Sequence, residues 1–391
     1  MTQDAIYKSS AINILGTYEV QATASSIISM QARGGAIPKT YGGSVDPWNH
    51  LEAAMALTTV GRIGEARKAI LWLAEIQNPN GSWYSGYDSA DNVLEYRIDT
   101  NQCVYIATTL LHHFLFTGDL AFLVRLWPTI AKAVNFVISY QTKAGNIPWS
   151  IDGEALCNSS EVTPYVKEEI TPSLLASSCS IHHSLRAAYI LSNILAASEN
   201  MHSISQYKDA LFVDYDPQYL QPIYLYSRFK LFKSINEYVY NRPNTEEEIY
   251  LNKDNYAMDN YYPMMTFLTS DAAVAKMVKA RDLFILDDWG VRCLVSQDWF
   301  TTAETSEWAI AEMCLGNRVL AKSLLISTYR HRLQDGSYLT GSVYPTKATF
   351  PRGEVSSYSS AAVILANDIL AGGITKQVFT DSKLSSWRAA I

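Results

Sequence analysis

Acidic side chains recur beside aromatic ones at several points of the sequence. Asp46 precedes Trp48 by two residues, and the run Asp298-Trp299-Phe300 leads into a segment that carries Glu304. Glycoside hydrolysis needs two carboxyl groups across a sugar ring, one as acid and one as base or nucleophile. Aromatic faces stack on sugars, and equally on isoprenoid chains or carbocations. The combination therefore favours a carbohydrate-active site, with an isoprenoid site as the alternative.

Five acids fall just before or within the first turn of segments that we predict to be helices. These residues are Asp46, Asp99, Asp259, Glu304 and Glu354. An acid at a helix start caps free N–H groups and complements the helix dipole, so a purely structural role is the alternative for each one. If these helices lie side by side, the five acids converge on one mouth.

We predict Glu304 and Asp99 as the acid–base pair, with Asp46 and Asp259 as groups that orient a water or a hydroxyl. Glu307 lies one turn after Glu304 and would raise its proton affinity. The helix N-terminus, in contrast, favours the ionised form of Glu304. Either member of the pair can therefore be the acid.

Aromatic, histidine and acidic residues near the same helix starts, or on glycine-rich loops, are the predicted substrate contacts. Burial in the core is the alternative for those in helices, whereas loops more often carry ligand contacts. Besides Asp46 and Asp259, the predicted contacts are Trp48, His50, Trp83, Tyr84, His182, Tyr261, Tyr262, Trp299, Glu307, Tyr338 and Tyr344.

No metal or cofactor is predicted. The pairs His112-His113 and His182-His183 point about 100° apart on a helix, which does not favour a joint metal site. The five cysteines are scattered and include no CxxC pair, so we expect reduced, buried thiols.

The elements that must position these groups are helices, because apolar residues recur with the helical period over most of the chain. The clearest start is Asp46 followed by Pro47. A first pair is expected across 5–31. Further helices are expected over 47–60, 62–77, 99–117, 119–141, 177–198, 203–236, 257–269, 271–284, 302–315, 317–333, 355–371 and 375–389.

Short and long connections alternate between the predicted helices. The long ones follow a recurring tag, in which a glutamine precedes a glycine by two to four residues: Gln31, Gln77, Gln141 and Gln334 begin the four copies. Repeated hairpins of one kind stack on their neighbours, and about six can close into a ring. We therefore predict an all-α fold, a single (α/α)6 toroid of alternating inner and outer helices over residues 1–391. The long loop over 142–176 is expected to form a lid or a wall of the mouth.

Two stretches resemble known families. The segment over 68–83, KAILWLAEIQNPNGSW, resembles the Gln–Trp repeat of triterpene cyclases, and 132–149 is a looser copy. In that family the repeat ties hairpins together, so the resemblance implies a toroid without implying cyclisation. The aspartate-rich motif of those cyclases and the zinc ligands of protein prenyltransferases have no counterpart here.

The run over 116–130, FTGDLAFLVRLWPTI, is similar to a helix-pair junction of six-hairpin glycosidases. This junction is structural, with Gly118 ending one helix and Asp119 capping the next. Both resemblances therefore imply the same fold, and neither carries over a catalytic residue.

Composition narrows the possible partners. A net charge of −7 in 391 residues gives no basic surface for nucleic acid or anionic membranes. No stretch approaches the roughly 20 apolar residues of a membrane span, and the first residues do not resemble a secretory signal, so we expect a cytoplasmic protein. The predicted function is a carbohydrate-active enzyme of glycoside hydrolase type acting on a glycan or glycoside. The alternatives are a terpenoid cyclase or prenyltransferase and a non-catalytic toroid that binds a glycan, lipid or peptide.

Overall fold

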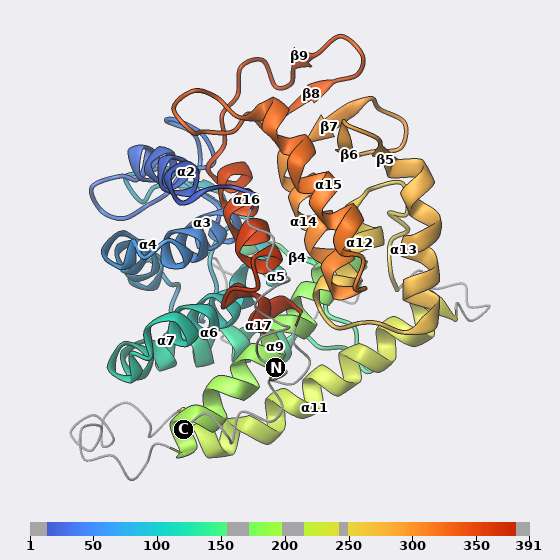
Figure 1. Cartoon of the computed structure of the whole chain (residues 1–391). Helices are drawn as coiled ribbons and strands as arrows, with labels where there is room; N and C mark the ends of the chain where they lie inside the picture. Colours follow the sequence, from blue (N-terminus) through green and yellow to red (C-terminus); the bar gives the residue numbers. More distant parts are fainter. Residues whose placement is uncertain (1–13, 155–171, 198–214, 242–248, 381–391) are drawn as a thin grey trace, which may run out of the picture.

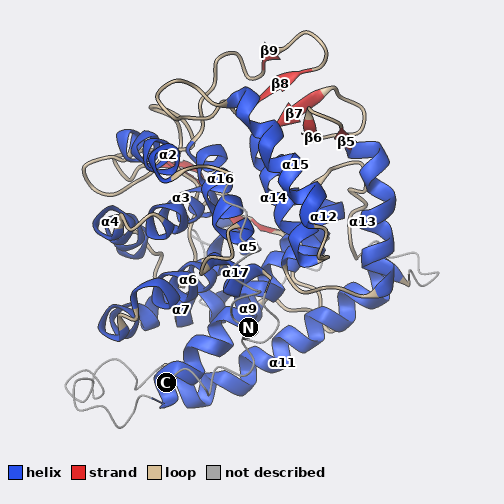
Figure 2. Ribbon diagram, viewed as in Figure 1, coloured by secondary structure: helices blue, strands red, loops and turns tan. Residues whose placement is uncertain are grey.

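The computed structural model describes residues 14–154, 172–197, 215–241 and 249–380 and is predominantly helical (Figure 2). One set of helices lies at the rim: α2 (Thr17–Met30), α4 (Ile63–Glu75), α7 (Leu120–Ser139), α11 (Pro217–Ile235), α13 (Asp271–Phe284) and α15 (Arg318–Ser327). The other set lies inside: α3 (Pro47–Thr59), α5 (Thr100–Val104) with α6 (Ile106–Thr117), α9 (Leu175–Ala197), α12 (Met258–Met265), α14 (Thr302–Cys314) and α16 (Ser357–Leu370). The prediction of a mainly helical fold is confirmed.

The inner helices contact one another in a closed order. The helix α3 packs on α6, then α9, α12, α14 and α16 follow, and α16 packs back on α3. Each outer helix packs on an inner neighbour, as α11 does on α9 and α15 on α14. Figure 1 shows this arrangement, with α2, α4, α7, α11 and α13 around the rim.

Glutamines of the predicted tag join successive outer helices. The side-chain amide of Gln77 donates to Gly81 O and to Thr129 O on α7, both at 3.0 Å. The same pair of bonds runs from Gln31 to the carbonyls of Gly35 and Glu65, and from Gln141 to those of Gly145 and Ser227. Each glutamine amide thus joins the turn after its own helix to the next outer helix. We call this pair of hydrogen bonds the staple.

The fourth tag is displaced from the predicted register. Gly336 closes the same kind of turn as Gly81, since its N–H donates to the carbonyl three residues earlier. Four residues before Gly336 lies Arg332, and the predicted Gln334 lies exposed in the turn itself. The assignment of Gln334 to the staple was therefore wrong.

The tryptophan that ends the second tag is part of the core. Trp83 is 1% exposed, and its indole N–H donates to Leu73 O of α4 at 2.7 Å. Trp83 therefore packs on the helix that carries Trp72.

Short strands occur that the sequence did not predict, so the described chain is not strictly all-α. Strands β5 (Ile285–Leu286), β6 (Gly290–Arg292), β7 (Trp299–Thr301), β8 (Gly341–Val343) and β9 (Ala348–Thr349) form an antiparallel sheet in that order. Two pairs accompany it, β1 (Gly86–Tyr87) with β2 (Val93–Glu95) and β3 (Ile98–Asp99) with β4 (Ser150–Ile151). Strands of two or three residues are too short to show an alternating pattern.

Several predicted elements have different bounds in the structure. The helix expected over 99–117 is divided at Tyr105 into α5 and α6. A π-helical turn (Asn236–Tyr240) extends α11, a 3-10 turn (Thr328–His331) follows α15, and α17 covers Thr375–Phe379. Parts of the helices expected over 5–31, 203–236 and 375–389, the middle of loop 142–176 and Cys157 lie outside the described residues.

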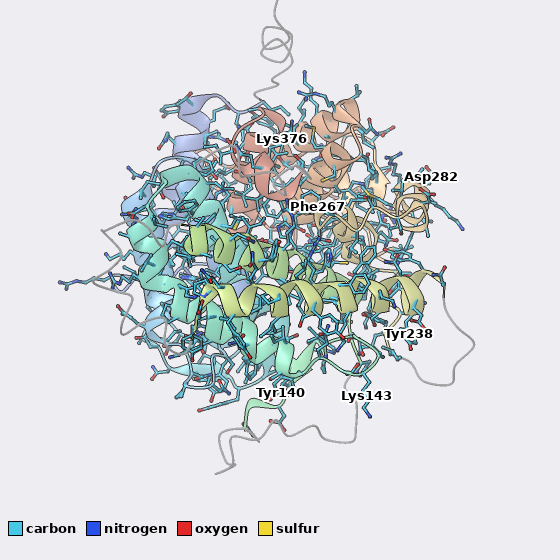
Figure 3. The ribbon with its side chains drawn as sticks, turned by 90° about the horizontal axis from the view of Figure 1, so that it is seen from below. Tyr140, Lys143, Tyr238, Phe267, Asp282 and Lys376 are labelled. Atoms are coloured by element: carbon cyan, nitrogen blue, oxygen red, sulfur yellow. The ribbon has the colours of Figure 1, made fainter. Side chains whose placement is uncertain are left out.

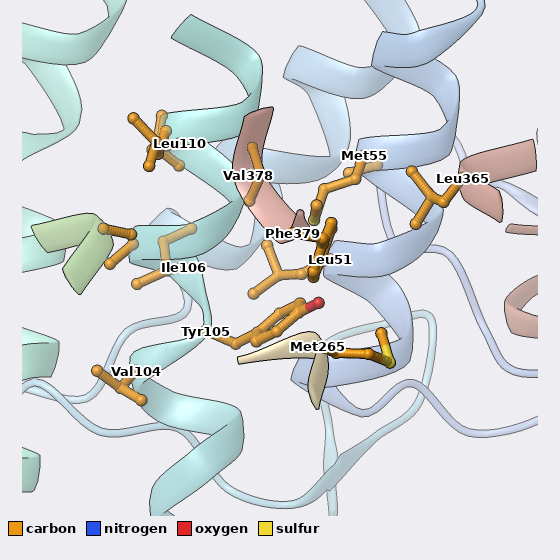
Figure 4. Packing of buried hydrophobic residues seen from close by; sticks show 14 of the residues in the cluster. Leu51, Met55, Val104, Tyr105, Ile106, Leu110, Met265, Leu365, Val378 and Phe379 are labelled. Carbon is orange, nitrogen blue, oxygen red and sulfur yellow. The ribbon is translucent and has the colours of Figure 1, made fainter. Parts of the chain in front are cut away.

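The long connections meet at one end of the ring. Thr40 bridges Ser356, and β3 pairs with β4, so that the segments before α3, α16 and α5 are joined there. Figure 3 shows Tyr140, Lys143 and Tyr238, which follow outer helices, toward this end, with Lys376 at the opposite end. At that opposite end α17 inserts Val378 and Phe379 between Leu51 of α3 and Leu110 of α6 (Figure 4). The end with the long loops is therefore the open one.

Among the described residues, α7 alone is long and apolar enough to cross a membrane. The greater part of its apolar stretch is buried in the structure, because the helix packs on α6 and α9. A core helix of a soluble protein has the same properties.

Candidate active site

A buried carboxyl group on α3 lies below the mouth of the ring. Glu52 is 9% exposed, and its Oε1 accepts hydrogen bonds from the indole N–H of Trp48 at 2.9 Å and from the hydroxyl of Tyr105 at 3.3 Å. Trp48 lies one turn earlier on α3, and Tyr105 lies at the joint of α5 and α6. Both donors are neutral. Burial raises the pKa of Glu52 to about 7; the Trp48 bond opposes this shift, and the nearby charge of Asp46 adds to it.

A second buried carboxyl, on the inner helix α14, interacts with Glu52. Glu307 on α14 is 7% exposed and accepts a hydrogen bond from the hydroxyl of Tyr261 on α12. Burial raises its pKa well above the usual range, and the charge of Glu52 is the next cause. Glu304, one turn earlier on α14, adds a smaller effect of the same sign. We call Glu52 and Glu307 the carboxyl pair.

Aromatic rings surround the carboxyl pair. The ring of Trp48 lies 5.8 Å from that of Tyr105 and 5.8 Å from that of Tyr262, edge-on in the second case. Tyr261 and Tyr262 are themselves 6.2 Å apart. These rings come from α3, α12 and the α5–α6 joint, so three inner helices contribute to one aromatic enclosure. The three tyrosine rings are fully buried, whereas Trp48 is only partly buried, so its ring is the one that can contact a sugar.

Two of the predicted acids cap helices at the mouth. Asp46 Oδ1 accepts from Asn49 N at 2.9 Å, and Lys39 lies 3.8 Å from its other oxygen. Asp259 accepts from Ala176 N at 3.2 Å and so caps α9, not its own helix. Burial raises the pKa of Asp259 to about 6. Both side chains are nine-tenths buried or more, and capping satisfies part of their hydrogen-bonding capacity.

The predicted catalytic residue Asp99 begins α5 at the edge of a cleft. Its Oδ1 accepts from Asn101 N and Gln102 N, and Arg97 lies 3.5 Å from its Oδ2. Burial raises the pKa of Asp99 to about 6, although Arg97 and the two backbone bonds lower it. The carboxyl is therefore partly protonated near neutral pH.

The cleft beside Asp99 has a volume of about 420 Å³ and is lined by polar and aromatic side chains: Tyr96, Arg97, Ser150, Ile151, Asp152 and Glu154. Arg97 also lies over the ring of Trp149, at 5.0 Å. Tyr84, a predicted substrate contact, packs edge-on against Tyr96 at 5.1 Å. A second cleft lies along the outer helix α15, away from the starts of the inner helices.

The predicted partner Glu304 lies in the first turn of α14 and is half-buried. It hydrogen-bonds with the thiol of Cys293, and its charge raises the pKa of Tyr358 on α16 and of Tyr261 on α12. Glu304 therefore lies between α12, α14 and α16. Asp99 lies on the side of α5 and interacts with a different set of residues.

Polar side chains near the starts of three inner helices have no hydrogen-bond partner within the described ranges. They are the Oδ1 of Asn101 and the Oε1 of Gln102 on α5, and the hydroxyls of Ser177 on α9 and Ser360 on α16. Burying such groups unpaired costs free energy.

Four predicted contacts are structural instead. Trp83 is buried against α4, as described above. His50 is fully buried, with one ring nitrogen bonded to Ala69 O and the other to Ile37 N. His182 bonds Thr266 O and faces Phe232 of the outer helix α11. Tyr338 is fully buried and interacts with Glu19 of the outer helix α2. Their assignment to the mouth was wrong, because each side chain contacts the helices or loops that form the ring.

The last two predicted contacts belong to the five-stranded sheet. The indole N–H of Trp299 donates to Phe350 O at 2.8 Å, and Tyr344 packs edge-on against Trp289 at 5.0 Å. Within the described chain, the ring contacts of both residues are therefore in the sheet region.

Two central residues were not assigned from the sequence. They are Glu52 on α3 and Tyr105 at the joint of α5 and α6. The spacing of Trp48 and Glu52, four residues apart in a helix, was the available signal, since it places the indole over the carboxyl. Among the described residues, no group of three or more His, Cys, Asp or Glu side chains has the arrangement of a metal site.

Several known proteins that resemble this chain are glycosidases or other sugar enzymes. No family model matches the chain. Solved structures of similar fold include a glycosidase variant in complex with glucose, with a TM-score of 0.64, 11% identity and coverage of 95% of this chain and 99% of that one. D-mannose isomerase has a TM-score of 0.59 at 11% identity, with coverage of 90% and 96%. At such identity these likenesses concern the fold alone.

One relative is close enough in sequence to assign the family. The MMP endo-(1,4)-3-O-methyl-alpha-D-mannosidase of Mycolicibacterium hassiacum is 32% identical over 359 residues, which cover 91% of this chain and 87% of the relative. This result confirms the prediction of a glycosidase-like hydrolase, and the chain belongs to the family of that endo-mannosidase.

Proposed function

We propose that this protein is a glycoside hydrolase that cleaves within an α-1,4-linked mannose-type glycan, including chains that carry 3-O-methyl groups. The observation that carries the proposal is the 32% identity to the endo-mannosidase over nearly the whole chain, because its name gives that linkage, that sugar and that mode of cleavage. The related fold bound to glucose supports a sugar substrate. The isoprenoid alternative has no comparable support.

The scaffold of the proposed activity is an (α/α)6 toroid open at the end of the long loops. The closed order of inner helices supports this assignment. The partly buried ring of Trp48 suits contact with a sugar ring.

Asp99 is the proposed acid and Glu304 the proposed base. In the closed order of inner helices, α5 with α6 and α14 are three steps apart in either direction and are therefore opposite each other. A pKa of about 6 lets Asp99 retain part of its proton near neutral pH. Asp99 protonates the glycosidic oxygen as the bond to the anomeric carbon breaks. Glu304 takes a proton from the water whose oxygen bonds that carbon, as in an inverting hydrolase.

Isosteric variants of both acids test this assignment. Asp99→Asn and Glu304→Gln are each expected to lower kcat on an α-1,4-linked 3-O-methylmannose oligosaccharide by roughly 10²- to 10⁴-fold. The double variant should lose little more than either single variant, because both residues serve one step.

Matched controls separate catalysis from helix capping. Asp216→Asn makes the same change at the N-cap of the outer helix α11, and Glu65→Gln changes the equivalent first-turn acid of the outer helix α4. Both controls should turn over normally. Near-normal turnover by Asp99→Asn and Glu304→Gln would eliminate the pair. Tight glycan binding by the natural sequence without any turnover would instead indicate the non-catalytic toroid.

A further inference from the structure

The carboxyl pair has no compensating cation among the described residues. No ion pair of the described chain involves Glu52 or Glu307, and their hydrogen-bond donors within it are neutral tryptophan or tyrosine groups. Another buried acid of α14, Glu312, does have a cationic partner. Arg281 donates two hydrogen bonds to it, at 2.8 and 2.6 Å. The absence of an arginine or lysine at the carboxyl pair is thus a local feature of the site.

Each acid of the carboxyl pair also has one oxygen that accepts no hydrogen bond from the described residues. Both bonds to Glu52 end on Oε1, and the bond to Glu307 ends on Oε2. No donor of the described chain reaches Glu52 Oε2 or Glu307 Oε1. The Trp48 ring, whose indole N–H donates to Glu52, is only partly buried beside the pair. Glu52 Oε2 and Glu307 Oε1 are the atoms through which the pair can bind a ligand.

The charged and titratable groups around the pair come from every helix that packs on it. Asp46 acts on Glu52 from the start of α3, and Glu304 acts on Glu307 from the start of α14. Tyr105, Tyr261 and Tyr262 face the pair as neutral phenols, because burial raises the pKa of each. Lys39 pairs with Asp46 at the mouth. Two further negative charges thus face two buried carboxyls, so ionising both is unfavourable.

We propose that Glu52 and Glu307 share one proton at neutral pH and together form a subsite for the hydroxyl groups of one sugar unit. The protonated acid donates a hydrogen bond to a sugar oxygen, and its ionised partner accepts one from a sugar hydroxyl. The two residues position the sugar ring against Trp48 and do not exchange protons with the reacting bond. The ligand part of this inference rests on the proposed function, whereas the shared proton does not.

The shared proton can be measured in the protein without substrate. Infrared spectroscopy at pH 8 should show the C=O stretch of a protonated carboxyl, which the double variant Glu52→Gln, Glu307→Gln should lack. Asp99 and Asp259 do not interfere, because pKa values of about 6 leave both ionised at pH 8. Equal spectra for the natural sequence and the double variant would overturn the inference, whatever the enzyme hydrolyses.

The ligand role is tested with methyl α-D-mannoside as the probe, by isothermal titration. Binding should weaken by about tenfold between pH 7 and pH 9 for the natural sequence, since the donor is lost on ionisation. Glu52→Gln should bind equally at both pH values, because an amide both donates and accepts, whereas Glu52→Leu should bind more weakly at both. A Glu52→Gln variant with the natural pH dependence would overturn the subsite. The protein could also show the carboxyl band at pH 8 and yet neither bind nor hydrolyse sugars. That result would support the shared proton and refute the proposed function.

Discussion

Replacing Glu52 by glutamine should change how the stability of the fold depends on pH. Burial raises the pKa of this carboxyl from 4.5 to about 7 in the folded chain. Between those values the folded protein binds a proton that the unfolded chain has released. The free energy of unfolding therefore falls as pH rises through this interval and levels off above it. Each pKa unit corresponds to about 1.4 kcal/mol, so the full effect is roughly 3 kcal/mol.

Urea denaturation followed by circular dichroism at pH 5, 6, 7 and 8 measures this effect. The natural sequence should lose stability across the series relative to Glu52→Gln, which has no proton to release at this position. The matched change Glu65→Gln, at a partly exposed acid, should leave the pH dependence as it is. Identical slopes for Glu52→Gln and the natural sequence would refute the reasoning, because they would mean that Glu52 titrates alike in the folded and unfolded chains.

Three further results are expected. Trp83→Ala should lower the free energy of unfolding by about 3–5 kcal/mol in urea, since it empties a buried site and leaves Leu73 O without its donor. A urea midpoint equal to that of the natural sequence would show that Trp83 does not stabilise the fold. Gln77→Leu should cost about 1–3 kcal/mol through its two lost bonds, whereas Gln334→Leu in the exposed turn should cost nothing measurable; equal losses would contradict the staple. Hydrolytic activity should survive exhaustive chelation, because the proposed chemistry needs only carboxyl groups, and a loss restored by added metal would refute it.

The fold was predictable because its signals are local and repeated. Asp46 with Pro47 marks a helix start, and the structure has the cap at that position. The Gln77 tag marks the end of an outer helix, and the amide forms the same two bonds in three copies. The five-stranded sheet was missed because its strands have two or three residues each, and its pairing is set by tertiary contacts.

The site was predictable only in part, because burial and facing direction are set by the whole ring. Tyr261, Tyr262 and Glu307 were predicted at the mouth and do gather in one cluster. His50 has the right type and spacing for a ligand contact, yet it points outward and joins α3 to α4. Glu52, two residues later, points inward. Periodicity identified the helix but did not decide which of its polar residues faces the ring centre.

The central claim is that the toroid hydrolyses an α-1,4-linked glycan by inversion between Asp99 and Glu304. Proton NMR of a fresh digest of an α-1,4-linked 3-O-methylmannose oligosaccharide tests it most directly, because the anomer formed first reports the mechanism. Inversion predicts internal cleavage with the β anomer appearing first, and no cleavage by Asp99→Asn or Glu304→Gln under conditions where Asp216→Asn and Glu65→Gln are active. Release of the α anomer first, or a natural-sequence protein that leaves the oligosaccharide intact, would contradict the account.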